Sequence, residues 1–135
     1  MSKQPTILVV DDEPEMRDVC RAALASEGYL VIQASDGLEA LEILDRHGGG
    51  GVDLVVSDAV MPRMGGRELL WEMSRRYPGI PVLLASGILH DPDASYGLEV
   101  APAAFVPKPF DPRQLLQRVR ETLQGTVELN GGGVG

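Results

Sequence analysis

The chain has 135 residues and a net charge of −8, and this acidity excludes the basic surface on which nucleic-acid binding depends. Its length suits one domain with a hydrophobic core, and no apolar run reaches the roughly 18 residues of a membrane span. Residues 1–5 lack the apolar stretch of a signal peptide, and a single cysteine, Cys20, excludes an internal disulfide. We therefore expect a cytoplasmic domain with Cys20 packed in its core.

Strand-like and helix-like patterns alternate along the first half of the chain, which predicts an α/β fold. Pro14 suits the first turn of a helix that stops at Gly28. Asp36 has a glutamate three positions later, the pattern of a helix N-cap. The expected elements are a strand at 6–11, a helix to about residue 27, a strand at 29–34, and a helix after Asp36 that turns Leu38, Leu41 and Leu44 to one face.

The second half of the chain continues the alternation. Strands are expected at 52–58, 80–85 and 103–107, and helices at 67–77 and from 111 to about 124. The segment 88–101 is the weakest helix, because Pro92, Gly97 and Pro102 limit it to about two turns. Residues 125–135 show no periodicity, so we expect one domain over 1–124 followed by a flexible tail or linker stub.

Charged residues stand where the predicted strands end. Asp11 and Asp12 follow the first strand, Asp58 ends the third, and Lys108 follows the fifth. The unbroken apolar strands indicate a parallel sheet covered on both faces, and such sheets bind ligands outside the carboxyl ends of their strands. Ser86 follows the fourth strand at the same edge. We therefore expect these five residues to meet in one small site.

The three aspartates of this site require a counter-charge. Two carboxylates about 4 Å apart repel by roughly 4 kcal/mol at an effective dielectric of 20. Lys108 supplies one positive charge, and a hard divalent ion with oxygen ligands would supply the rest. Because cysteine and histidine are absent from the site, Mg²⁺ is favoured over zinc, with Mn²⁺ as a second candidate. A carboxylate beside Mg²⁺ can attack phosphorus, and Asp58, Lys108 and Ser86 suit the acceptor, the cation and the hydroxyl donor of that chemistry.

Residues 6–124 resemble the receiver domain of two-component response regulators. The matching pieces are residues 7–13, Asp58 with Met61-Pro62 after it, Ser86 after a strand, and Lys108-Pro109-Phe110. Residues 84–87 and 105–110 are similar to receivers fused to hybrid histidine kinases. The resemblance implies a flavodoxin-like, doubly wound α/β fold with a five-stranded parallel sheet in the order 2-1-3-4-5. It also implies five helices, the fourth short or irregular.

The resemblance further implies the role of each site residue. Asp58 is the phosphoacceptor, Asp12 and the Val60 carbonyl bind Mg²⁺ together with Asp58, and Asp11 acts through water. Ser86 and Phe105 occupy the positions of the switch hydroxyl and the rotating aromatic. A histidine kinase or a phosphotransfer domain is the implied donor, and the Lys108-Pro109 bond is expected to be cis. The cognate kinase, the output and the oligomeric state stay open, as does the choice between a stand-alone regulator and one domain of a longer protein.

Some positions depart from the family pattern. Gly65 replaces a frequent acidic residue, so the loop before it is expected to be looser. Phe105 has no hydroxyl, so a switch there must work by packing. Val60 and Ile88 flank the expected path of a hydrolytic water, and neither can orient it. We therefore expect slow autodephosphorylation rather than enzymatic turnover.

The same residues favour three other functions less strongly. A phosphatase that uses an aspartyl-phosphate needs a second acid near the nucleophile, and Ala59 and Val60 offer none. A docking module without phosphoryl chemistry would not need the intact set of charged residues. A nucleotide-binding domain is disfavoured because no glycine-rich loop follows the first strand. His47 and His90 stand in or beside loops without matched partners, and we expect no role in the site for either.

Overall fold

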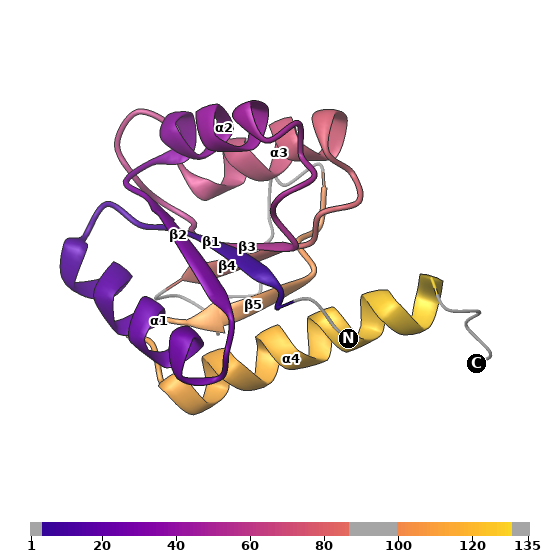
Figure 1. Cartoon of the computed structure of the whole chain (residues 1–135). Helices are drawn as coiled ribbons and strands as arrows, with labels where there is room; N and C mark the ends of the chain where they lie inside the picture. Colours follow the sequence, from indigo (N-terminus) through magenta and orange to yellow (C-terminus); the bar gives the residue numbers. More distant parts are fainter. Residues whose placement is uncertain (1–3, 87–99, 131–135) are drawn as a thin grey trace.

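A computed structural model describes the backbone of residues 4–86 and 100–130. Five parallel strands form one sheet in the order β2-β1-β3-β4-β5 (Figure 1), which confirms the expected topology. The strands are β1 (Thr6–Val10), β2 (Leu30–Ala34), β3 (Leu54–Asp58), β4 (Val82–Ser86) and β5 (Ala104–Pro107). The helices of the described residues are α1 (Pro14–Ser26), α2 (Gly37–Arg46), α3 (Gly66–Arg76) and α4 (Pro112–Asn130).

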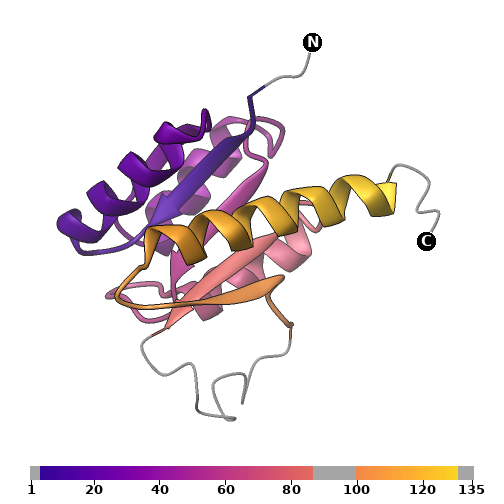
Figure 2. The same ribbon diagram turned by 90° about the horizontal axis from the view of Figure 1, so that it is seen from below.

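Helices cover both faces of the sheet. Figures 1 and 2 show α2 and α3 over one face and α1 and α4 over the other. Alternate residues of β1 enter different cores: Leu8 and Val10 pack beneath α2 and α3, whereas Ile7 and Val9 pack beneath α1 and α4. No residue of β1 faces solvent, which explains why this strand is an unbroken apolar run.

The start of α2 follows the predicted capping pattern. The Asp36 carboxylate accepts the Glu39 backbone N–H at 2.9 Å, and the Glu39 carboxylate accepts the Ser35 N–H at 2.6 Å. The predicted inner face was partly wrong, because Leu38 is 40% exposed. The buried apolar residues of α2 are instead Ala40, Leu41, Ile43 and Leu44. Gly37 and Ala40 of the same first turn are buried, so Leu38 lies to the side of the covered face of α2.

Cys20 is fully buried in the core beneath α1 and α4, as expected. Burial raises the pKa of its thiol to about 12, with a smaller contribution from the negative charge of Asp11. The thiol therefore stays protonated near neutral pH and packs as a small apolar group. Gly28, the predicted helix stop, has a φ of +89°, which a residue with a side chain rarely adopts.

The last helix is longer than its sequence pattern predicts. We expected it to end near residue 124, yet the backbone stays helical to Asn130, and the end of α4 projects beyond the sheet (Figure 2). Gly125 costs about 1 kcal/mol relative to alanine in a helix interior, which is too little to end a helix by itself. The domain boundary at 124 stays a prediction. The fourth helix expected at 88–101 falls largely outside the described residues.

No helix of the described residues has both the length and the apolar character needed to cross a membrane.

Candidate functional site

Four of the five predicted residues, Asp11, Asp12, Asp58 and Lys108, meet at the carboxyl edge of the sheet. Asp11 directly follows β1, Asp58 is the last residue of β3, and Lys108 directly follows β5. The Lys108 ammonium donates to Asp11 Oδ2 at 2.9 Å and to Asp58 Oδ2 at 3.0 Å. Strands β1 and β3 are neighbours at the point where the strand order reverses, which is where doubly wound sheets bind ligands. The structure therefore brings together side chains that are 50 and 97 positions apart.

Burial and charge act in opposite directions in this pocket. The Asp11 side chain is only 1% exposed and that of Lys108 is 13% exposed. Burial raises the pKa of Asp58 above its usual value, although the hydrogen bond and charge of Lys108 oppose the shift. Burial alone would lower the pKa of Lys108, but its contacts with Asp11 and Asp58 outweigh this and raise it. Lys108 is therefore a constant positive charge between the two carboxylates.

The acidic cluster is larger than predicted. Carboxylate oxygens of Asp11, Asp12, Glu13 and Asp58 all lie within 4.8 Å of one another. Glu13 was not predicted to take part, and its carboxylate accepts from Lys108 at 3.3 Å. The signal in the sequence was the run of three consecutive acids. Four carboxylates around one ammonium leave an excess of negative charge, and this all-oxygen set fits a hard divalent cation such as Mg²⁺.

The loop after Asp58 forms the open side of the pocket. The Val60 N–H donates to Asp58 Oδ1 at 3.4 Å, and Val60 is 77% exposed. The Gly66 N–H donates to the Ala59 carbonyl at 3.1 Å and closes this loop, and the expected looseness at Gly65 stays a prediction. A Cβ atom at position 65 would lie 2.8 Å from the same carbonyl oxygen. The acidic residue that is frequent at this position would therefore not fit in this loop conformation.

The two expected switch residues lie on neighbouring strands. Ser86 is the last residue of β4 and pairs in register with Pro107 of β5, but its side chain lies outside the description. Phe105, on β5, is half-buried and packs against the core beneath α2 and α3. Their roles stay predictions. The Lys108-Pro109 peptide bond is cis, as predicted.

Gly66, the first residue of α3, leads to a prediction about stability. A Cβ atom there would lie 2.3 Å from the Asp58 carbonyl oxygen and 2.9 Å from Leu84 Cδ2. Gly66→Ala should therefore lower the free energy of unfolding by about 3 kcal/mol, measured by urea denaturation. Gly79→Ala is the control, because no atom lies within 4 Å of its Cβ position, and it should change stability by less than about 0.5 kcal/mol. Equal stability of the two variants would contradict the prediction.

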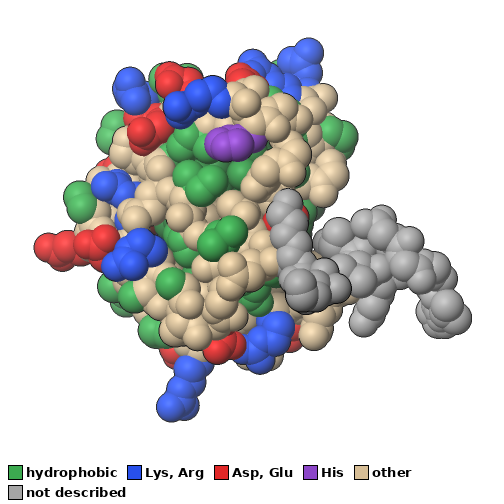
Figure 3. Space-filling view, in the orientation of Figure 1, with side chains coloured by type: hydrophobic (Ala, Val, Ile, Leu, Met, Phe, Trp, Pro, Cys, Tyr) green, Lys and Arg blue, Asp and Glu red, His purple; other side chains and the backbone are tan. Residues whose placement is uncertain are grey.

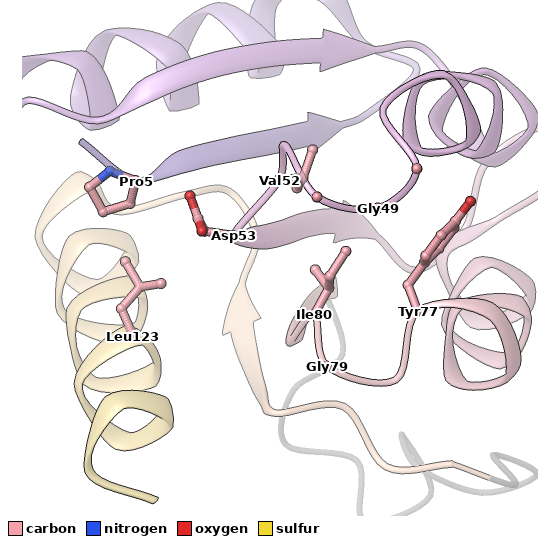
Figure 4. A pocket seen from close by; sticks show the side chains of 10 residues that line it. Pro5, Gly49, Val52, Asp53, Tyr77, Gly79, Ile80 and Leu123 are labelled. Carbon is pink, nitrogen blue, oxygen red and sulfur yellow. The ribbon is translucent and has the colours of Figure 1, made fainter. Parts of the chain in front are cut away.

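A cavity of about 550 Å³ lies away from the acidic cluster, at the amino ends of the strands. Its lining includes Pro5, Val52, Tyr77, Ile80 and Leu123 (Figure 4). Figure 3 shows hydrophobic side chains gathered at the centre of one face of the molecule, with most charged side chains toward its outline. The one carboxylate of the cavity, that of Asp53, accepts the Thr6 N–H at 2.7 Å and so ties β1 to the start of β3. Among the residues that the structure describes, those that line this cavity include no member of the acidic cluster.

Comparison with known proteins agrees with this geometry. Residues 7–120 match the response regulator receiver domain family. The chain is 43% identical over 124 residues to the sensor kinase CckA of Brucella abortus (strain 2308), covering 92% of this chain and 13% of that protein. It is 35% identical over 130 residues to the response regulator GtcR of Aneurinibacillus migulanus, covering 96% of this chain and 51% of that protein. The chain thus spans about half or less of these relatives.

Solved structures show the same fold. The receiver domain of the hybrid histidine kinase CckA superposes with a TM-score of 0.71 at 36% identity, covering 88% of this chain and 99% of that chain. A CheY-like receiver domain protein from Methanospirillum hungatei JF-1 superposes with a TM-score of 0.82 at 28% identity, covering 93% and 98%. Since both the family match and the fold extend over most of the chain, it belongs to the response regulator receiver domains of two-component systems.

Proposed function

We propose that this receiver domain accepts a phosphoryl group onto Asp58 from the phosphohistidine of a histidine kinase or a phosphotransfer domain. The observation that carries the proposal is the Lys108 ammonium held between Asp11 and Asp58 at 2.9 and 3.0 Å. A cation fixed beside a carboxylate at this edge of the sheet is placed to receive negative charge that arrives with a ligand. The resemblance of CckA to this chain makes a kinase donor the natural first candidate.

Mg²⁺ is the proposed cofactor, and Mn²⁺ could replace it. Asp12, Asp58 and the Val60 carbonyl would hold the ion directly, and Asp11 would hold it through water. When bound, the ion neutralises charge on the carboxylates and on the incoming phosphoryl oxygens. Glu13, the fourth carboxylate of the cluster, would add to the negative potential that attracts the ion.

The chain's own residues supply the rest of the reaction. A carboxylate oxygen of Asp58 attacks phosphorus, the P–N bond to the histidine ring breaks, and its electron pair stays on the ring nitrogen. The ring leaves as neutral imidazole when its other nitrogen carries a proton. Lys108 then pairs with a phosphoryl oxygen, and the Ser86 hydroxyl donates to another. Phe105 would respond by repacking, since it has no hydroxyl group to hydrogen-bond.

The phosphoryl group should be lost slowly, so the domain acts as a signalling acceptor and not as an enzyme with turnover. Val60 is exposed beside Asp58 and carries no group that could orient a water. Ile88, the second flanking residue, lies outside the described residues. If the water is not held in position, the activation barrier of hydrolysis rises by roughly 1–3 kcal/mol. Hydrolysis then slows about 5- to 150-fold relative to a domain that positions the water. We therefore expect a phosphorylated state that lasts many minutes or longer in the absence of a phosphatase.

Intact mass after incubation with a small-molecule phosphodonor tests the proposal. With Mg²⁺ the protein should gain one phosphoryl group, and with EDTA it should gain none, because the acidic cluster then repels the donor. Peptide mapping should place the group on Asp58. A decay time course in the same assay measures its lifetime, expected to be many minutes. Uptake that persists unchanged in EDTA would contradict the metal-dependent mechanism.

A further inference from the structure

The loop of residues 59–65, which we call the acceptor loop, joins β3 to α3 and is fixed at its base. The Ala59 N–H donates to the Ala85 carbonyl of β4 at 2.9 Å, and the Ala59 carbonyl accepts the Gly66 N–H at 3.1 Å. These two bonds hold only the ends of the loop. Val60, whose carbonyl is a proposed metal ligand, lies between them and is exposed.

The far side of the acceptor loop is held by residues from another part of the chain. Arg63 Nε donates to Asp36 Oδ2 at 2.7 Å, and Arg63 Nη2 donates to the same oxygen. One residue further along, the Met64 carbonyl accepts the Gly37 N–H at 2.9 Å. Asp36 and Gly37 form the start of α2, which lies beside α3 on the same face of the sheet (Figure 1). The tip of the loop is therefore attached to the N-terminus of α2.

Two features indicate that this attachment is specific. Arg63 has a φ of +67°, a conformation that residues with side chains rarely adopt and that surrounding contacts must hold. Gly37 has no room for a side chain, because a Cβ atom there would lie 2.6 Å from Met64 Cγ and 2.9 Å from the Met64 carbonyl oxygen. The Asp36 side chain is 9% exposed, so its charge is largely shielded from water and pairs with Arg63.

The segment that bears Asp36 is also linked to the acidic cluster, through a backbone hydrogen bond. The Asp11 N–H donates to the carbonyl of Ala34, the last residue of β2, at 3.1 Å. Asp36 follows Ala34 by two positions, so the segment that bears Asp36 is hydrogen-bonded to the backbone of Asp11. The pair of Asp36 and Arg63 thus connects the segment beside Asp11 with the loop that follows Asp58.

We propose that Asp36 and Arg63 are positioning residues that hold the acceptor loop, which directly follows Asp58, in the conformation in which the Val60 carbonyl can serve as a ligand of the metal beside the phosphoryl group. This inference rests on the proposed function. It assigns Asp36 a second role beside its cap of α2, where its other oxygen accepts the Glu39 N–H. Positioning errors of about 1 Å can slow a reaction by up to about 100-fold, so loss of the pair should slow phosphoryl uptake measurably.

The test uses two conservative variants of the full chain and their combination. Asp36→Asn keeps an oxygen that can cap α2 but removes the carboxylate charge. Arg63→Gln removes the guanidinium. Arg76→Gln is the matched control, because Arg76 also pairs with an aspartate, Asp45, at 3.2 Å, away from the acidic cluster. The rate of phosphoryl uptake by intact mass and the amide hydrogen exchange of Val60 and Gly66 without metal are the two measurements.

Each single variant should slow phosphoryl uptake about 5- to 100-fold and speed the exchange of the Val60 and Gly66 amides. The double variant should be no slower than the slower single variant, since both remove the same contact. Arg63→Lys, which keeps the charge, should recover part of the rate, and Arg76→Gln should match the wild type.

Three results would contradict the proposal that Asp36 and Arg63 hold the acceptor loop. Opposite changes in rate for Asp36→Asn and Arg63→Gln would show that their charges act at long range and not through contact. An unchanged rate with lower thermal stability would show a purely structural ion pair. Unchanged exchange of the loop amides would show that the pair does not hold the loop. If the wild type takes up no phosphoryl group, the proposed function is overturned, and the exchange rates still decide whether the pair holds the loop.

Discussion

Asp58→Asn is expected to abolish phosphoryl uptake and to leave the fold intact. The side-chain amide has nearly the shape of the carboxylate but lacks the anionic oxygen that attacks phosphorus. The fold should tolerate the change because burial already disfavours the charged form of Asp58. Lys108 would keep its 2.9 Å hydrogen bond to Asp11. Intact mass with a phosphodonor and Mg²⁺ should show no added group, and thermal unfolding should match the wild type within a few degrees.

Asp45→Asn is the control for this experiment. Asp45 lies on α2, and its carboxylate contacts Tyr77 and Arg76, not the acidic cluster. This variant loses the same charge and should take up one phosphoryl group at the wild-type rate. If Asp58→Asn still gains a group, then another carboxylate of the cluster accepts it, and the assignment of Asp58 is wrong.

Lys108→Met is expected to have opposite effects on metal binding and on phosphoryl transfer. The ammonium lies 2.9 to 3.3 Å from carboxylates of Asp11, Glu13 and Asp58, so it competes with a divalent ion for the same oxygens. Its removal should tighten Mg²⁺ binding by about 10-fold. This change corresponds to only part of the roughly 4 kcal/mol by which two charges 4 Å apart interact at a dielectric of 20. Phosphoryl uptake should slow by about 100-fold or more, since one fixed donor to the phosphoryl oxygens is lost.

Calorimetric titration of Mg²⁺ and intact mass measure the two effects of Lys108→Met separately. Arg120→Met is the matched control, because Arg120 pairs with Glu27 at 3.1 Å on the α1 and α4 side of the domain. This variant removes the same charge. At an ionic strength that screens the long-range effect of the charge, it should change neither Mg²⁺ affinity nor the rate of phosphoryl uptake by more than about 2-fold. Weaker Mg²⁺ binding in Lys108→Met would show that the lysine organises the metal site and does not compete with it.

Local patterns were sufficient to locate the strands and to place the site residues at one edge of the sheet. Strands β1 and β3 are largely buried apolar runs because helices cover both faces of the sheet, so the runs themselves mark these strands. In a parallel sheet all strands end at the same edge, so Asp11, Asp58 and Lys108 had to lie along one edge once the strands were recognised, and the strand order decided how near they lie. The order of the strands came from the family resemblance and not from the patterns.

Helix ends and faces were predicted less well. The sequence pattern stopped the last helix at residue 124, whereas its backbone continues to Asn130. A single glycine lowers helix stability without forbidding a helix, so its position alone does not give the end. Leu38 has the correct spacing for the buried face of α2 but lies 40% exposed. Steps of three residues drift around a helix of 3.6 residues per turn, so Leu38 lies away from the direction of the buried Ala40 and Leu44.

The sequence by itself thus determined the fold class, the position of the acidic cluster and the chemical character of the site, because these depend on residue type and on strand ends. Only the tertiary structure decided which polar side chains meet across loops. Glu13 reaches Lys108, and Arg63 reaches Asp36 across 27 positions, without any periodic signal in the chain. The path of a loop depends on hydrogen bonds to segments that are distant in sequence, such as the bond from Gly37 to Met64, and local propensity does not encode such bonds.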